Sequence, residues 1–250
     1  MEEVPQLNHF SSINLSQMDR VKLLRRSDTK YLISQTELMG FLVDLASDYF
    51  VLEIKGKRLA SYHTNYLDTR LKSFYHDHHQ GKLKRHKVRF RTYLDSDLSF
   101  LEVKLKYKAK TNKKRMSTEP SDPLDKAQKK FLSRWIPENP MDLFTSLENS
   151  FQRITLVHKT AEERVTIDLN LHFISGEKKV KFKDQVIVEI KQSQVNRDTL
   201  MSRLLRSKGI RMLRVSKYCI GCILVDPSIK YNRFKSRLLK INEINPIWNS

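Results

Sequence analysis

The sequence predicts an α+β protein whose centre is a closed or nearly closed antiparallel β-barrel of eight or nine strands. Segments such as 87–91 and 101–106 alternate charged with apolar residues, so each strand has one charged and one apolar face. Short connections between the segments favour antiparallel pairing. Candidate helices gather at the start, middle and end of the chain, where they can cover the outward apolar face.

In the first half of the chain, a weak helix is predicted around 17–24 and a strand follows at 28–33. Ser34 is a typical N-cap for a helix whose apolar residues recur at helical spacing as far as Leu45. A short helix is expected over 70–76 and a basic loop over 107–120. The other strands of this half are predicted at 49–54, 59–67, 87–94 and 98–106, the last two joined through Asp95-Ser96-Asp97.

In the second half, helices are predicted at 125–135 and 141–147, because four prolines bracket these segments. They form a helical insert at about 121–148 in a single domain that spans 1–250 with a core of about 26–226. The end is helical over 197–207, stopped by Gly209, and over 216–224, before a basic tail. Strands resume at 151–158, 164–173, 179–182 and 186–192.

The charge of the chain indicates a polyanionic partner. With 47 Lys and Arg against 28 Asp and Glu, the formal net charge is +19. Residues 81–115 hold thirteen Lys or Arg and three acids, a net charge of +10. In an open sandwich this charge would form a solvated or nucleic-acid-binding surface. In a barrel covered from outside, it would point inward and line a basic tunnel.

Other features narrow the class of protein. The N-terminus lacks the basic region and apolar core of a signal peptide, and no apolar run approaches a membrane span, so we expect a soluble, cytoplasmic protein without membrane insertion. Cys219 and Cys222 form a C-x-x-C spacing without a second ligand pair, so they are interpreted as small buried residues. The run 76–79, which contains three histidines, is interpreted as a solvated turn before Gly81.

An ordered set of short motifs resembles the VTC domain. This domain is the polyphosphate polymerase module of the vacuolar transporter chaperone complex, within the CYTH-like triphosphate tunnel metalloenzymes. The motifs are Asp28-Thr29-Lys30-Tyr31, Tyr66-Leu67-Asp68-Thr69, Val88-Arg89-Phe90-Arg91-Thr92-Tyr93, Phe100-Leu101-Glu102-Val103-Lys104, Phe151-Gln152-Arg153, Arg164-Val165-Thr166-Ile167-Asp168, Val188-Glu189-Ile190-Lys191 and Val215-Ser216-Lys217-Tyr218. The resemblance implies a closed eight-stranded antiparallel tunnel with flanking helices.

The resemblance also implies roles for individual residues. Glu189 resembles the metal-holding glutamate, and Glu102 is a possible second ligand or the partner of a lumen lysine. One of the basic residues 113–115 corresponds loosely to a further basic residue of the family. The residues that resemble phosphate-binding or catalytic positions are Lys30, Arg89, Arg91, Lys104, Arg153, Arg164, Ser216 and Lys217.

These residue types suit phosphoryl transfer. Arginine bonds two phosphate oxygens at once and keeps its charge when desolvated, while Mn²⁺ or Mg²⁺ needs only one or two carboxylates beside phosphate oxygens. Because crowded arginines repel one another, a bound anion should stabilise the fold. The stretch 26–30 supplies at most one acid where hydrolytic relatives carry E-x-E-x-K.

The resemblance therefore favours a phosphotransferase that uses ATP and a divalent metal to extend inorganic polyphosphate. A tripolyphosphatase or nucleoside triphosphatase of the same fold is the first alternative. A binding module for nucleic acid or polyphosphate, without catalysis, is the second. We expect no dedicated nucleic-acid partner, since neither an RNP motif nor a helix-turn-helix pattern occurs in the sequence.

Overall fold

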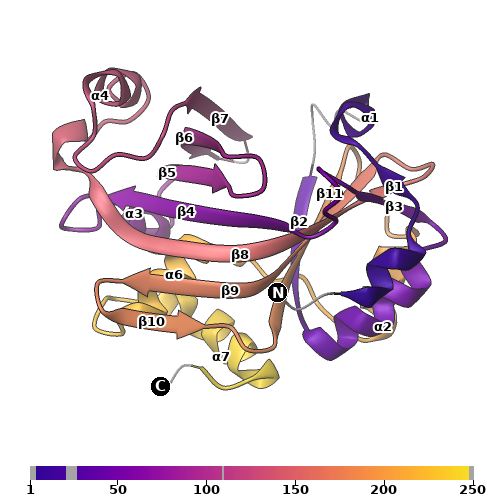
Figure 1. Cartoon of the computed structure of the whole chain (residues 1–250). Coiled ribbons are helices and arrows are strands. Elements are labelled where there is room, and N and C mark those ends of the chain that lie inside the picture. The colour runs from indigo at the N-terminus through magenta and orange to yellow at the C-terminus, as the bar shows by residue number, and fades with distance from the viewer. Residues whose placement is uncertain (1–3, 21–26, 109, 248–250) are drawn as a thin grey trace.

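The computed structural model describes residues 4–20, 27–108 and 110–247, and its centre is one strongly curved sheet (Figure 1). Every pairing along its main path is antiparallel. The order of the eight strands on this path is β2 (Ser27–Ser34), β11 (Gln185–Gln192), β9 (Glu163–Ser175), β8 (Phe144–His158), β4 (Ala60–Asp68), β5 (Lys84–Tyr93), β6 (Leu98–Tyr107) and β7 (Lys110–Ser117). Three shorter strands, β1 (Ser12–Ile13), β3 (Tyr49–Leu52) and β10 (Lys178–Lys181), pair at its margins. The predicted α+β class and the antiparallel eight-stranded path are confirmed.

The two ends of the path, β2 and β7, do not pair with each other in the described ranges, so the sheet is a half-barrel rather than a ring closed by hydrogen bonds. β7 is rich in lysine and mostly exposed, which is typical of an edge strand. In place of direct pairing between the two ends of the sheet, residues 213–217 cross the concave side from β2 to β5. The Leu213 N–H donates to the Lys30 carbonyl (2.8 Å), and Lys87 Nζ on β5 donates to Ser216 Oγ (2.8 Å).

The convex face is apolar and covered by helices, as predicted. The 3₁₀ turn η1 (Pro5–His9), α2 (Gln35–Leu45) and α5 (Leu200–Ser207) cover the convex face of β2, β9 and β11. α2 starts with the predicted cap, since Ser34 and Glu37 form a reciprocal capping box. α3 (Ser73–Gln80) and α4 (Lys126–Leu132) pack over the outward residues Val88, Phe90, Leu101 and Val103 of β5 and β6. Charged residues that alternate with these must therefore point to the concave side.

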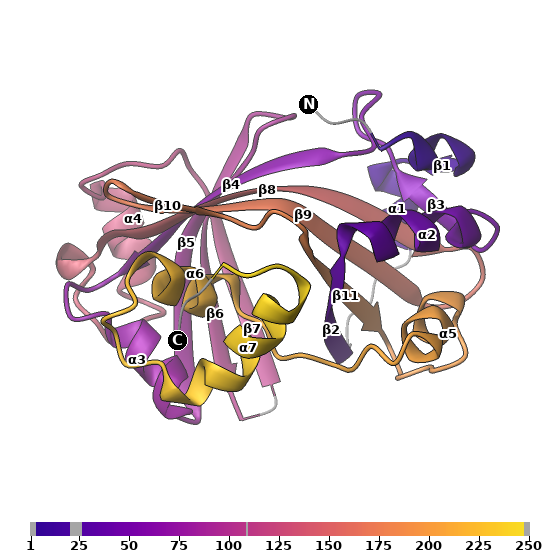
Figure 2. The same ribbon diagram turned by 90° about the horizontal axis from the view of Figure 1, so that it is seen from below.

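Helix α6 (Lys217–Val225) packs on the concave side, against β8, β9 and β10 (Figure 2). It contacts Leu147 and Phe173 so closely that a Cβ on Gly221 would lie 2.6 Å and 2.5 Å from their side chains. Only glycine permits this approach, which fixes how deep α6 enters the half-barrel. Cys219 and Cys222 are buried in this helix, as the sequence predicted. Helix α7 (Lys235–Ile244) packs beside it.

Two element predictions were wrong. Residues 107–120 were expected to be a loop but contain β7, which pairs with β6 from Lys110 to Ser117. The sequence pattern did not predict this strand, because Met116 is the only apolar residue of β7. Residues 141–147 were expected to be helical but contain the end of η2 (Pro140–Asp142) and the start of β8. Pairing with β4 overrides the local helical spacing, so the helical insert ends before Phe144.

Three smaller differences concern helices. The run 76–79 lies in α3 rather than in a solvated turn, and the buried His79 bonds Asn232 (2.8 Å). The basic tail contains α7. Of the helix predicted around 17–24, the structure shows α1 (Leu15–Arg20), and residues 21–24 lie outside the described residues. None of the helices in the described ranges is long and apolar enough to cross a membrane.

Candidate active site

The register of the sheet places every predicted strand residue of the site on the concave face. Arg89 is paired with Glu102, Lys30 with Glu189, and Arg153 with Asp168. Since directly opposite residues of neighbouring strands share a face, these pairs extend one charged surface across the half-barrel. The strand residues on this surface, called the lumen below, include Lys30, Arg89, Arg91, Glu102, Lys104, Arg153, Arg164, Asp168, Glu189 and Lys191.

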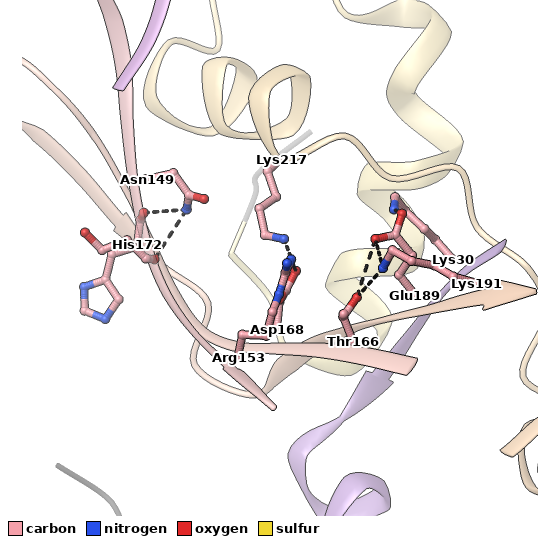
Figure 3. Close-up of polar contacts among 10 residues, drawn as sticks. Lys30, Asn149, Arg153, Thr166, Asp168, His172, Glu189, Lys191 and Lys217 are labelled. Atoms are coloured by element: carbon pink, nitrogen blue, oxygen red, sulfur yellow. Dashed lines mark hydrogen bonds and ion pairs between the residues drawn. The ribbon is translucent and has the colours of Figure 1, made fainter. Parts of the chain in front are cut away.

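The first ion cluster joins two strands to the first residue of α6 (Figure 3). Arg153 binds Asp168 through two parallel bonds, Nε to Oδ1 at 2.6 Å and Nη2 to Oδ2 at 2.9 Å, and Lys217 Nζ donates to the same carboxylate. Burial alone would raise the pKa of Asp168, but Arg153 and Lys217 hold it well below its usual range. The carboxylate is therefore ionised at neutral pH.

The second cluster surrounds Glu189. Lys30 bonds one of its oxygens, and Lys191 Nζ lies 2.7 Å from the other and also donates to Thr166 Oγ1 at 2.7 Å. Burial and the neighbouring ammonium groups of Lys191 and Lys217 lower the pKa of Lys30 to about 6. At neutral pH this side chain is therefore mostly a neutral amine in the empty lumen.

The third cluster lies on the opposite arm. Arg89 Nε and Nη2 donate to Glu102 Oε2 at 2.9 and 2.8 Å, and Lys113 of β7 bonds the other oxygen. Burial opposes ionisation of Glu102, yet Arg89 and Arg91 lower its pKa to about 2. The wrongly predicted loop therefore contributes a lumen cation, because β7 continues the alternation of β6.

Arg91 differs from the other buried lumen arginines. It is only 8% exposed, it forms no ion pair with any residue of the described ranges, and its Nε has no hydrogen-bond partner there. Burial, followed by Arg89, lowers its pKa to about 10, so it stays charged at neutral pH. Thr64, opposite Arg91, and Asn149, opposite Thr64, also have buried side-chain oxygens without a partner. These unsatisfied polar atoms indicate a place for a bound group.

Aromatic rings lie between the cations. The Arg91 guanidinium is 5.8 Å from the ring centres of Tyr62 and Phe151, Arg153 is 5.2 Å from that of Tyr62, and Lys217 Nζ is 4.4 Å from that of Phe151. Their quadrupoles stabilise cations where water is scarce. The sequence analysis predicted no role for the rings of Tyr62 and Phe151. It also predicted none for Asp168, Lys191 and Thr166. The sequence does contain indications of both. Tyr62 and Tyr66 lie at alternate positions of β4, and Asp168, Lys191 and Thr166 lie in the motifs quoted above.

The remaining predicted residues lie on the same surface. Lys104 is opposite both Lys87 and Lys113, and Arg164 is opposite Lys191. Ser216 caps α6, since its Oγ accepts from the Cys219 N–H at 3.3 Å and from Lys87. Glu102, Asp168 and Glu189 are each bonded by two basic side chains, and further basic residues, Lys87, Arg91, Lys104 and Arg164, lie on the same face. The lumen carries a net positive charge.

Whether a divalent metal fits this site depends on its carboxylates. No group of three or more His, Cys, Asp or Glu side chains that could hold a metal occurs in the described part of the chain. Glu102 is buried between Arg89 and Lys113, and four strands of the path separate β6 from β11. Glu189 is bonded by Lys191 on one oxygen and by a mostly neutral Lys30 on the other, so the oxygen beside Lys30 suits a hard cation whose other ligands are phosphate oxygens.

The half-barrel with a cationic lumen is a fold that solved structures share. A candidate adenylate cyclase from Bacillus halodurans matches with a TM-score of 0.51 at 12% identity over 77% of this chain and 94% of its own. A protein from Pyrococcus horikoshii matches with a TM-score of 0.45 at 12% identity over 78% and 97%. No curated protein sequence matches. Residues 25–225 match the model of the VTC domain, so the chain belongs to the VTC domain family.

Proposed function

We propose that this protein is a polyphosphate polymerase, which transfers the terminal phosphate of ATP to a growing inorganic polyphosphate chain in the lumen. Membership of the VTC domain family supports the proposal. The single observation that carries it is Arg91, a buried guanidinium that is charged and lacks a carboxylate partner among the described residues. A phosphate group would supply the missing negative charge and accept from the unsatisfied Nε.

In this account the surrounding residues bind and orient the triphosphate. Arg91 and Arg153 project from strands on either side of β4, and Lys217 enters from α6 above the same site. Together they neutralise the charge that develops on the equatorial oxygens during transfer. A Mn²⁺ or Mg²⁺ ion at Glu189 would polarise the phosphate oxygens.

The carboxylates of the lumen favour a phosphate acceptor over water. The oxygens of Asp168 and Glu102 accept from two cations each, and their lowered pKa values make them poor proton acceptors. Water attacks efficiently only when a base removes its proton, whereas the terminal oxygen of polyphosphate is already ionised. Asp168 and Glu102 are therefore poorly suited to activate water, and chain growth, which needs no base at these two positions, fits them better.

The direct test is incubation of the purified protein with ATP and Mn²⁺, followed by separation of the products on a gel. The account predicts long-chain polyphosphate and release of ADP. Orthophosphate without chain growth would instead assign the protein as a hydrolase of triphosphates. Absence of turnover together with RNA binding that weakens steeply with salt would leave only a polyanion-binding module.

Glu189→Gln should abolish turnover while tripolyphosphate still binds. The amide keeps the shape of the side chain but is a much weaker ligand for a hard cation. We expect turnover at saturating Mn²⁺ to fall about 10²-fold or more, in line with loss of a charge-stabilising group. Turnover and calorimetric binding are measured side by side on the variant and the wild type. Full turnover in the variant would place the metal elsewhere.

Binding of tripolyphosphate at pH 8 should take up protons, because the anion restores the charge of Lys30. Its pKa of about 6 in the empty lumen lies below the ordinary value of 10.5, so the amine is mostly neutral between these limits. In the same pH range the unfolded chain binds more protons than the folded protein, so the contribution of Lys30 to stability rises with pH. Calorimetry in two buffers of different ionisation enthalpy measures the uptake. Lys30→Arg, which stays charged, should take up fewer protons; equal uptake would contradict the assignment.

A further inference from the structure

A second cationic pocket lies outside the lumen, on the convex side of β2 and β11. Its volume is about 640 Å³, within the range of small-molecule sites. Tyr31 and Ile190 form part of its floor, and they alternate with the lumen residues Lys30 and Glu189. Because successive side chains of a strand point to opposite faces, this outer pocket lies back to back with the Glu189 cluster.

The charges of the outer pocket are of one sign. Arg197, Arg206 and Arg211 line it, and none of its lining residues, as the structure describes them, is acidic. All three arginines are exposed at the mouth, so their guanidinium groups are free to turn toward a ligand. Three arginines that line one pocket without a carboxylate favour a multiply charged anion.

The rest of the lining is apolar and aromatic. Ile190 and Leu205 are buried beneath the pocket, and Tyr31 is half-buried. Val195 and Met212 stand at its rim with 59% and 57% of their surfaces exposed. A bare phosphate would leave this surface uncovered. The lining therefore suits an anion that also carries a flat or apolar part.

We propose that the outer pocket binds a nucleoside phosphate such as ADP. The phosphates contact the three arginines, and the base covers Tyr31 and the apolar rim. This site is separate from the lumen, and the inference does not depend on the proposed polymerase activity.

The outer pocket is also physically connected to the lumen. Its wall at Gly209–Met212 continues into Leu213, whose N–H bonds the Lys30 carbonyl (2.8 Å), and then into Ser216 and Lys217. A ligand in the pocket thus contacts the segment that carries Lys217 into the lumen. We expect each site to change the affinity of the other by the same factor, as linkage requires.

Hydrogen–deuterium exchange with increasing ADP tests the proposal, because the two sites lie in different peptides. The account predicts slower exchange in 195–212 for the wild type. The double variant Arg206→Ala/Arg211→Ala should need at least about tenfold more ADP to reach the same protection of 195–212. Arg203→Ala removes an exposed arginine of the same helix that does not line the pocket, and should behave like the wild type.

Three results would overturn the proposal: no protection of 195–212, equal protection in the double variant, or protection by anionic lipid vesicles but not by ADP. The last would assign the arginines to a membrane surface. Pyrophosphate that binds as tightly as ADP would overturn the nucleoside part. Failure of the polymerase proposal is seen separately, as missing long-chain polyphosphate among the products formed from ATP and Mn²⁺.

Discussion

Replacing Arg91 by alanine should lower kcat/KM for ATP about 10³-fold or more, the effect of losing an arginine that stabilises a transferred phosphoryl group. The same change should leave the folded protein as stable as the wild type or more stable. Arg91 is buried without a carboxylate partner in the described ranges, so its removal relieves an uncompensated charge next to Arg89 and Arg153. Initial rates and urea unfolding are measured on the same preparations.

Two control variants make this result specific. Arg91→Lys keeps the charge but loses the planar fork, so its rate should fall between those of the wild type and Arg91→Ala. Arg203→Ala removes an exposed arginine on the convex side and should leave the rate unchanged. An Arg91→Ala protein that turns over at the wild-type rate would place the chemistry outside the lumen.

Asp168→Asn should have the largest effect on stability. The change leaves two largely desolvated cations, Arg153 and Lys217, whose side chains are 16% and 12% exposed, facing a neutral amide. Breaking a buried ion pair by removing one partner costs about 3–5 kcal/mol in the free energy of unfolding. Urea denaturation measures the loss. Added tripolyphosphate should restore much of it, because the anion supplies the charge that Asp168 provided.

The matched control for Asp168→Asn is Glu243→Gln, which changes an exposed carboxylate of α7 that pairs with the exposed Lys240. An ion pair of this kind contributes little, so its loss should cost about 1 kcal/mol or less. If Asp168→Asn lowers the free energy of unfolding no more than the control does, then opposed charges do not hold the lumen together.

The fold could be predicted because alternation is a local property. Val88 and Phe90 point outward under α3 and α4, and this alone sends Arg89 and Arg91 inward. β7 could not be found in this way, since a strand that faces water or the lumen on both sides needs no apolar residues. The segment 141–147 was misassigned because seven residues do not distinguish a helical period from pairing with β4.

The residues of the site were predictable, but their partners were not. The motifs placed Arg89, Arg91 and Arg153 on the inward faces, yet which arginine has a carboxylate opposite depends on the register between neighbouring strands. The irregular register between Ser150 and Gln152 helps to set Arg153 against Asp168. Arg91 instead meets Thr64 and Phe100. Its lack of a counter-charge is visible only once the sheet is assembled.

In the proposed function, cations from strands far apart in sequence surround one bound triphosphate. A crystal structure of the protein with tripolyphosphate and Mn²⁺ tests it most directly. The account predicts phosphate oxygens within hydrogen-bond distance of Arg91, with Lys217 and Arg153 on the same anion and the metal at Glu189. An anion bound only on the convex side, with Arg91 still unpaired, would contradict it.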